Sequence, residues 1–209
     1  MHEREPADAQ AADMTGVLVR VLVRHDGWDV AEAALVELVA QTLPAPADHV
    51  RLGRRCPRCG ATDHGRPVVV APLDGRRLHV SLGRTLGRVA VAVGSAGPVG
   101  VDIERVDPER FAGVAAVAQH DYEPDADSRG LVAARWVRKE AILKATGWGL
   151  TEDPAGLDLT PRRPSPFAVT ATRNGLVVRV WVSELGVGTR YAAAVAVVGE
   201  TPPRVTLVS

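Results

Sequence analysis

The chain has 209 residues, of which 46% are hydrophobic and 24% are charged, and its formal net charge is zero. This composition is typical of a soluble protein with one large domain or two small ones, and zero net charge excludes a whole-molecule field that would favour nucleic acid or an anionic membrane. The sequence contains no apolar run long enough to span a bilayer. Residues 1–14 include acids and lack the apolar stretch of a secretion signal, so we expect a flexible leader and a cytoplasmic protein.

The part of the chain before residue 99 is predicted to form a strand, a helix and then three strands. An apolar, β-branched run at 17–23 predicts the first strand. Asp29 stands where an N-cap is expected, and residues 30–43 have helical spacing. Residues 51–67 are predicted to be a loop. Strands are then predicted at 67–73, 77–82 and 88–95, and the turn "LDGRR" is predicted to join the first two as a hairpin.

The remainder of the chain repeats this order. A strand at 98–106 is followed by a helix at 108–120, capped by Asp107, and by a longer helix at 131–147 that ends on Gly147. The later strands are predicted as a short one at 156–159, an Asn-Gly hairpin at 167–184 and a last one at 190–198. We therefore predict an α+β fold with two similar halves, 15–98 and 99–209. Each half has a strand, a helix and a three-stranded sheet, and the halves are related by a pseudo-twofold axis.

The predicted strand "VGVDIERV" places two carboxylates on one of its faces. Because side chains alternate along a strand, Gly100, Asp102 and Glu104 point one way and the three apolar residues point the other. Two acids here also fit a strand end at the protein surface, and that interpretation stays open from spacing alone. Gly100 would clear space either for a ligand or for a neighbouring strand.

Charge is distributed unevenly along the chain. Residues 51–88 contain nine arginines and two acids, whereas residues 100–160 contain twelve acids and seven basic residues. One part could therefore hold an anion and the other a cation, although two solvated surfaces of opposite sign would have the same composition.

The predicted helix at 131–147 places Trp136, Glu140 and Lys144 along one stripe, since they are four residues apart. Glu140 and Lys144 could be an ordinary i,i+4 ion pair. Two observations favour a different role. The stripe carries a tryptophan, so we expect this face to be at least partly buried. The chain also uses 23 arginines and only two lysines, Lys139 and Lys144, both in this helix. A lysine is a compact point charge suited to a phosphate.

Two carboxylates on a strand and one on a helix suit a hard cation. Mg²⁺ prefers oxygen ligands and commonly joins one or two carboxylates to substrate phosphates. The set Asp102, Glu104 and Glu140 therefore indicates a possible Mg²⁺ site.

The order of these motifs resembles that of the phosphopantetheinyl transferases. "VGVDIE" followed by "WVRKEAILK" is similar to that family's signature pair, and the closest resemblance is to its larger, monomeric, surfactin-synthetase-activating type. The segment "HGRP" resembles the family's G-[KR]-P loop, and "LHVSL" stands where the family has SxSH. The resemblance implies the phosphopantetheinyl transferase fold in a monomeric protein.

The resemblance also implies a reaction and the residues that perform it. The phosphopantetheine arm of coenzyme A would move to a serine of an apo acyl or peptidyl carrier protein of polyketide, nonribosomal peptide or fatty acid synthesis, leaving adenosine 3′,5′-bisphosphate. Asp102, Glu104 and Glu140 would be Mg²⁺ ligands, and Glu140 could also act as the base. The residues implied to bind the phosphates of coenzyme A are Arg66, Ser81 and Lys144.

The sequence departs from the family pattern at two positions. Leu82 follows Ser81 where the family has histidine, and Val137 follows the tryptophan where it has Ser, Thr or Cys. We predict that Arg84 or Arg88 compensates for the missing imidazole. Leu82 also leaves open a non-catalytic member of the same fold that binds a carrier protein or coenzyme A. Another Mg²⁺-dependent phosphotransferase is a third interpretation.

The only two cysteines form a "CPRC" motif, with His64 nearby. Cys56, Cys59 and His64 are half of a common zinc signature, because the second ligand pair is missing. A structural metal and a metal-free loop both remain open.

Overall fold

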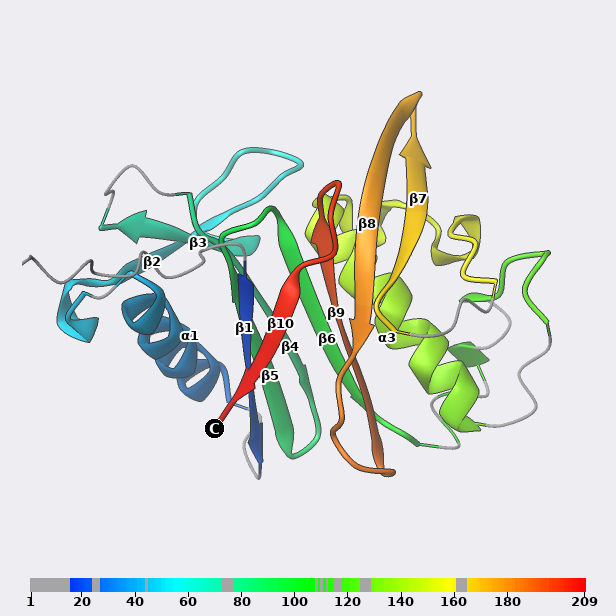
Figure 1. Cartoon of the computed structure of the whole chain (residues 1–209), viewed down its shortest axis with the longest axis horizontal. Helices are drawn as coiled ribbons and strands as arrows, with labels where there is room; N and C mark the ends of the chain where they lie inside the picture. Colours follow the sequence, from blue (N-terminus) through cyan, green and yellow to red (C-terminus); the bar gives the residue numbers. More distant parts are fainter. Residues whose placement is uncertain are drawn as a thin grey trace, which may run out of the picture.

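The computed structural model describes residues 16–23, 27–43, 45–72, 77–107, 118–124, 129–160 and 165–209, together with 109, 111, 113 and 114. Two four-stranded sheets occupy the middle of the molecule, and each is covered by a helix on its outer side (Figure 1). Helix α1 (Trp28–Thr42) covers the first sheet and α3 (Arg129–Thr146) covers the second. Among the described residues, no helix is long and apolar enough to cross a membrane.

The first sheet has the strand order β10-β1-β5-β4, and the second has the order β6-β9-β8-β7. The strands of the first sheet are β10 (Arg204–Val208), β1 (Gly16–Val23), β5 (Arg88–Gly94) and β4 (His79–Thr85). Those of the second are β6 (Val99–Arg105), β9 (Tyr191–Val198), β8 (Leu176–Glu184) and β7 (Phe167–Arg173). Strands β2 (Arg51–Arg55) and β3 (Arg66–Ala71) form a separate antiparallel pair. The short helices are η1 (Ala47–His49), η2 (Gly149–Thr151) and η3 (Pro154–Gly156).

Side-chain alternation in the strands separates the core into three layers. In β5 the valines at 89, 91 and 93 pack toward α1, whereas Ala90 and Ala92 pack between the two sheets. In β6 the apolar face, Val99, Val101 and Ile103, also fills the space between the sheets. The third layer lies between α3 and the outer face of the second sheet. Burying each large aliphatic side chain contributes about 1.5–3 kcal/mol, so the alternating pattern fixes which face of β6 is left for α3.

The α+β class is confirmed, and the strand order is similar in the two sheets. In the first sheet β1 pairs with β5, and β5 pairs with β4. In the second sheet β6 pairs in the same way with β9, and β9 pairs with β8. The pseudo-twofold axis itself stays a prediction. The chain then leaves the second sheet, and β10 pairs in parallel with β1.

Four local predictions are wrong. Residues 51–55 form β2 rather than a loop, because they pair with β3. The predicted hairpin of β3 with β4 does not form, because β4 pairs instead with β5 across the turn at Leu86 and Gly87. Residues 73–76 of the predicted turn lie outside the described residues. Residues 156–159 form no strand. Helix α1 begins at Trp28 with Gly27 as its N-cap, so Asp29 lies in the first turn instead.

The predicted helix at 108–120 lies only partly within the described residues. Its cap is confirmed, because the Asp107 carboxylate accepts the backbone N–H of Glu109 at 3.0 Å. The Asn-Gly turn is also confirmed: Asn174 and Gly175 have φ values of 47° and 79° and join β7 to β8.

Candidate active site

The two sheets meet along the edges of β4 and β6, and side chains of β4 join them. Ser81 Oγ accepts the backbone N–H of Val101 at 3.1 Å, and Thr85 Oγ1 accepts that of Arg105 at 3.1 Å. Between them, a Cβ on Gly83 would lie 2.9 Å from Asp102 Cα. A glycine is therefore required at 83 for the two strands to approach, and hydroxyl groups satisfy the backbone of β6 on either side of it.

Thr85 also orients one of the predicted metal ligands. Its hydroxyl donates to Glu104 Oε2 at 2.8 Å, and both residues are buried. A hydroxyl has one proton and two lone pairs, so Thr85 can accept from the backbone of Arg105 and donate to Glu104 at the same time. Thr85 was not predicted as a site residue, although Ser81, Gly83 and Thr85 alternate along β4 as small residues of one face.

Helix α3 lies directly against the backbone of β6. A Cβ on Gly100 would fall 2.0 Å from Ala141 O and 2.5 Å from Ala145 N. Gly100 therefore makes room for the backbone of α3, and neither a ligand nor a strand requires it. This close approach brings the stripe of α3 that carries Glu140 and Lys144 to the face of β6 that carries Asp102 and Glu104.

Lys144 is held by the strands rather than by its neighbour on the helix. Its Nζ donates to Asp102 Oδ1 at 2.7 Å and to the carbonyl oxygens of Val101 and Leu82 at 3.1 and 3.2 Å. An ammonium group has three donors, so these contacts engage all of them. The simple i,i+4 pair with Glu140 is thus replaced by an ion pair across the helix–strand contact. Trp136 is partly buried against the α3 core, as expected for this stripe.

Lys139, the other lysine, has a separate role. It is fully buried, and its Nζ donates to Ala118 O at 2.6 Å and to Glu123 Oε2 at 3.0 Å. Glu123 Oε1 in turn accepts the backbone N–H of Leu159 at 2.8 Å. Burial lowers the pKa of Lys139. This pair attaches the segments around 118–123 and 159 to α3.

Glu140 completes a group of three carboxylates. Its pKa is raised from 4.5 to about 6, first by burial and then by the negative charges of Asp102 and Glu104, while Lys144 opposes the shift. Glu140 Oε1 is buried and has no hydrogen-bond partner among the described residues. An acceptor without a donor, next to two further carboxylates, fits a divalent cation with oxygen ligands. The residues present therefore suit the predicted metal.

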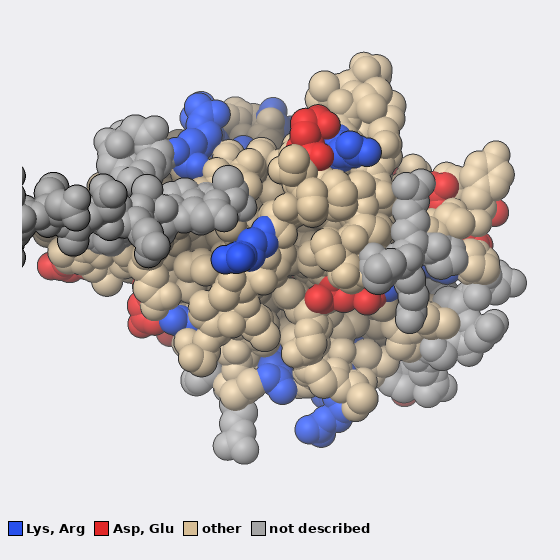
Figure 2. Space-filling model, in the orientation of Figure 1, with Lys and Arg blue, Asp and Glu red and all other residues tan. Residues whose placement is uncertain are grey.

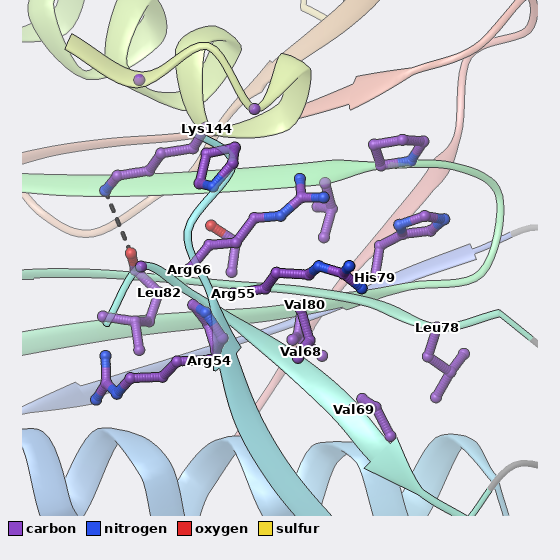
Figure 3. Close-up of a pocket in the computed structure, with 18 of the residues that line it drawn as sticks. Arg54, Arg55, Arg66, Val68, Val69, Leu78, His79, Val80, Leu82 and Lys144 are labelled. Atoms are coloured by element: carbon purple, nitrogen blue, oxygen red, sulfur yellow. Dashed lines mark hydrogen bonds between the residues drawn. The ribbon is translucent and has the colours of Figure 1, made fainter. Parts of the chain in front are cut away.

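A cavity of about 640 Å³ adjoins this group at Lys144. It lies between β3, β4 and the C-terminal end of α3, and Arg55, Arg66 and His79 lie along it in Figure 3. No Asp or Glu is found among the described residues that line it. The basic residues of the lining are Arg54, Arg55, Arg66, Arg77, His79 and Lys144. A basic and otherwise apolar cavity suits an anion with an apolar or aromatic part.

The structure places the predicted phosphate-binding residues at different distances from this cavity. Arg66 and Ser81 line it, with Arg66 Nη1 3.1 Å from where a Cβ on Gly147 would lie. Arg84 and Arg88 do not line it. The guanidinium of Arg84 lies 4.4 Å from the centroid of the Trp28 ring, and that of Arg88 lies 4.7 Å from the ring of Tyr191. Compensation for Leu82 by these two arginines stays a prediction.

Several basic residues of the cavity were not predicted. Arg54 and Arg55 lie on β2, which was expected to be a loop, and His79 stands two residues before Ser81 on the same face of β4. Burial and the charges of Arg77 and Arg66 lower the pKa of His79. The excess of arginine in residues 51–88 was the one feature of the sequence that indicated a basic site in this region. On the face shown in Figure 2, basic and acidic side chains form small separate groups. Four arginines line the cavity, namely Arg54, Arg55, Arg66 and Arg77.

The carboxylates, Lys144 and α3 all lie within one segment that is similar to a known protein family. Residues 98–196 match the family model of the 4′-phosphopantetheinyl transferase superfamily. The match includes β6, α3 and most of β9. No curated protein matched the chain. This similarity supports phosphopantetheine transfer in general. Proteins of the superfamily use coenzyme A, act on carrier proteins and typically use a divalent metal.

Proposed function

We propose that the protein transfers the 4′-phosphopantetheine arm of coenzyme A to a serine of an apo acyl or peptidyl carrier protein, with Mg²⁺, as a monomeric cytoplasmic enzyme of the surfactin-synthetase-activating type. The observation that carries this proposal is that a group of carboxylates lies directly beside a basic cavity. Three carboxylates converge where Lys144 meets Asp102, and a basic cavity begins at the same lysine.

The cavity would bind coenzyme A through its phosphates. Arg66 lies at the end of α3 beside Gly147, and we assign to it the 3′-phosphate. Ser81 could donate its hydroxyl proton to a phosphate oxygen, since its lone pair already accepts the N–H of Val101. The further arginines and His79 add positive charge along the same wall. Lys144 is the basic residue nearest the carboxylates and is assigned to the pyrophosphate, whose oxygen would replace one of the two backbone carbonyls that its Nζ contacts here.

The carboxylates would hold the metal and the attacking serine in place. Asp102, Glu104 and Glu140 would be the Mg²⁺ ligands, with Glu104 fixed by Thr85. When bound, Mg²⁺ would neutralise the negative charge of the pyrophosphate. The serine oxygen forms a bond to the phosphorus of the phosphopantetheine arm while the bond from that phosphorus to the bridging oxygen breaks, and adenosine 3′,5′-bisphosphate leaves. Glu140, directly or through a water molecule, would take the serine proton.

The test is an intact-mass assay. The protein is incubated with coenzyme A, Mg²⁺ and a panel of apo carrier proteins, and each carrier is examined for an added phosphopantetheine. Asp102→Asn should abolish the modification while circular dichroism stays unchanged, and the exposed Asp48→Asn serves as the matched control. If no carrier is modified by the folded protein, but coenzyme A or a carrier binds, the non-catalytic interpretation replaces this one.

A further inference from the structure

The loop between β2 and β3 brings its three potential metal ligands together. The ligand atoms of Cys56, Cys59 and His64 all lie within 4.8 Å of one another. The loop is closed by its own backbone: Cys56 N–H donates to Ala61 O and Gly60 N–H donates to Cys56 O, both at 2.9 Å. Gly60 has a φ of +76°, which favours glycine at this turn. The three side chains are therefore placed by a tight turn and are not scattered along a surface.

The spacing of these atoms is close to that of a tetrahedral zinc site. With bonds of about 2.3 Å to sulfur and 2.0–2.1 Å to nitrogen, tetrahedral geometry sets roughly 3.6 Å between S and N ligands and roughly 3.8 Å between two sulfurs. Cys59 Sγ lies 3.5 Å from His64 Nε2. Since no two of the three ligand atoms are more than 4.8 Å apart, each pair would need to approach by at most about 1.2 Å to meet this geometry.

The surroundings of the cluster also favour a bound metal. His64 Nδ1 contacts Asp63 Oδ1 at 2.7 Å, which directs the other ring nitrogen, Nε2, to Cys59. A carboxylate on the far nitrogen is a common support for a metal-binding histidine. Both cysteines are free thiols.

We propose that Cys56, Cys59 and His64 bind one Zn²⁺ ion, with the fourth position open to water. Two sulfurs and an imidazole select a borderline-soft cation and disfavour Mg²⁺, which requires oxygen ligands. This site is separate from the carboxylates, and its existence does not depend on the transfer reaction.

A zinc ion here would tie the two ends of the loop together. Gly65 closes the loop so tightly that a Cβ on it would lie 2.5 Å from Arg55 C and Cys56 Cα. Arg55 and Arg66, the last residue of β2 and the first of β3, both line the basic cavity. The metal would thus be a structural support for one wall of that cavity.

The test measures zinc directly on the reduced full-length protein. After removal of metals with a chelator, the protein is dialysed against ZnCl₂ in the presence of saturating Mg²⁺, and bound zinc is counted per chain by mass spectrometry. We expect one zinc per chain. Cys56→Ser and Cys59→Ser should each lose it, and Asp63→Asn should weaken it by about 10–100-fold. His49→Ala, an exposed histidine on η1, is the control and should keep it.

A second measurement identifies the ligands. Co²⁺ in place of zinc should produce a thiolate-to-metal charge-transfer band in the wild-type protein, and this band should be absent in Cys56→Ser. Wild-type protein that binds no zinc when reduced would overturn the proposal. Zinc that stays bound in a Cys56→Ser, Cys59→Ser double variant would overturn it too, because the metal would then occupy another site. Circular dichroism establishes that each variant is folded.

Discussion

Replacing Glu140 with glutamine should stabilise the metal-free protein at neutral pH. Glutamine has nearly the same shape and cannot ionise, whereas ionised Glu140 is half-buried beside two other carboxylates. Its pKa rises from 4.5 to about 6, a change of about 1.5 pKa units at ~1.4 kcal/mol each. The ionised side chain therefore costs the folded state about 2 kcal/mol. Partial exposure screens the charge, so the expected gain for Glu140→Gln is about 1–2 kcal/mol.

The sign of the pH dependence follows from the direction of the shift. The pKa of Glu140 is higher in the folded state than in the unfolded chain, so its protonated form favours folding. That contribution is fully present below about pH 4.5 and is lost as the pH rises through about 6. The stability gap between Glu140→Gln and the wild type should therefore be small near pH 4.5 and reach its full size above about pH 7.

Urea unfolding with a chelator present, at a series of pH values, measures this gap. Glu32→Gln, on the exposed side of α1, is the matched control and should change stability by less than about 0.5 kcal/mol. With Mg²⁺ in place of the chelator, the wild type should gain more stability than Glu140→Gln, because the variant lacks one charged ligand. A variant that is less stable than the wild type at about pH 7.5, or a gap that does not change with pH, would refute the crowding of carboxylates at this site.

Further substitutions test other parts of the site. Gly100→Ala should destabilise the protein by more than about 4 kcal/mol in urea unfolding, because its Cβ would overlap Ala141 O. Gly186→Ala is the control and should not cause this destabilisation, because no atom lies within 4 Å of the added Cβ. Thr85→Val should weaken Mg²⁺ binding about 10–100-fold in calorimetry, and Thr85→Ser should restore it; equal affinities would show that the hydroxyl does not orient Glu104. Arg66→Ala should raise the KM for coenzyme A about 10-fold or more. If Arg84→Ala and Arg88→Ala both leave that KM unchanged, their predicted compensation for Leu82 is wrong.

The central parts of the site could be predicted because they depend on local periodicity. Alternation along 99–105 separates the acids from the apolar side chains of β6, and the four-residue spacing of Glu140 and Lys144 places them on one face of α3. These two patterns require no knowledge of the rest of the fold. The C-terminal end of α3 and the β7–β8 turn were likewise predictable, since Gly147 and the Asn-Gly pair have φ values that favour those residues.

The remaining features depend on which segments meet in space. Strand β2 has arginines at both ends and little alternation, so only its pairing with β3 identifies it. The hairpin at 73–77 was predicted from a good turn sequence, but β4 gains more by pairing with β5, whose residues from Val89 to Gly94 are all buried. The role of Thr85 depends on the register of β4 against β6, which belong to different sheets. The register between two strands of different sheets cannot be predicted from the local sequence of either strand.

The structure also changes what Leu82 implies. Its side chain packs against the cluster beneath α1, as those of Leu78 and Val80 do, and its contribution to Lys144 comes from the backbone carbonyl. That carbonyl would be present with any residue at 82, so the position of Lys144 does not require the family's histidine. The cavity also contains an imidazole, because His79, two residues before Ser81 and on the same face of β4, lines it. A leucine at 82 is therefore compatible with an intact basic wall of the cavity, and it is weaker support for a non-catalytic protein than the sequence alone suggested.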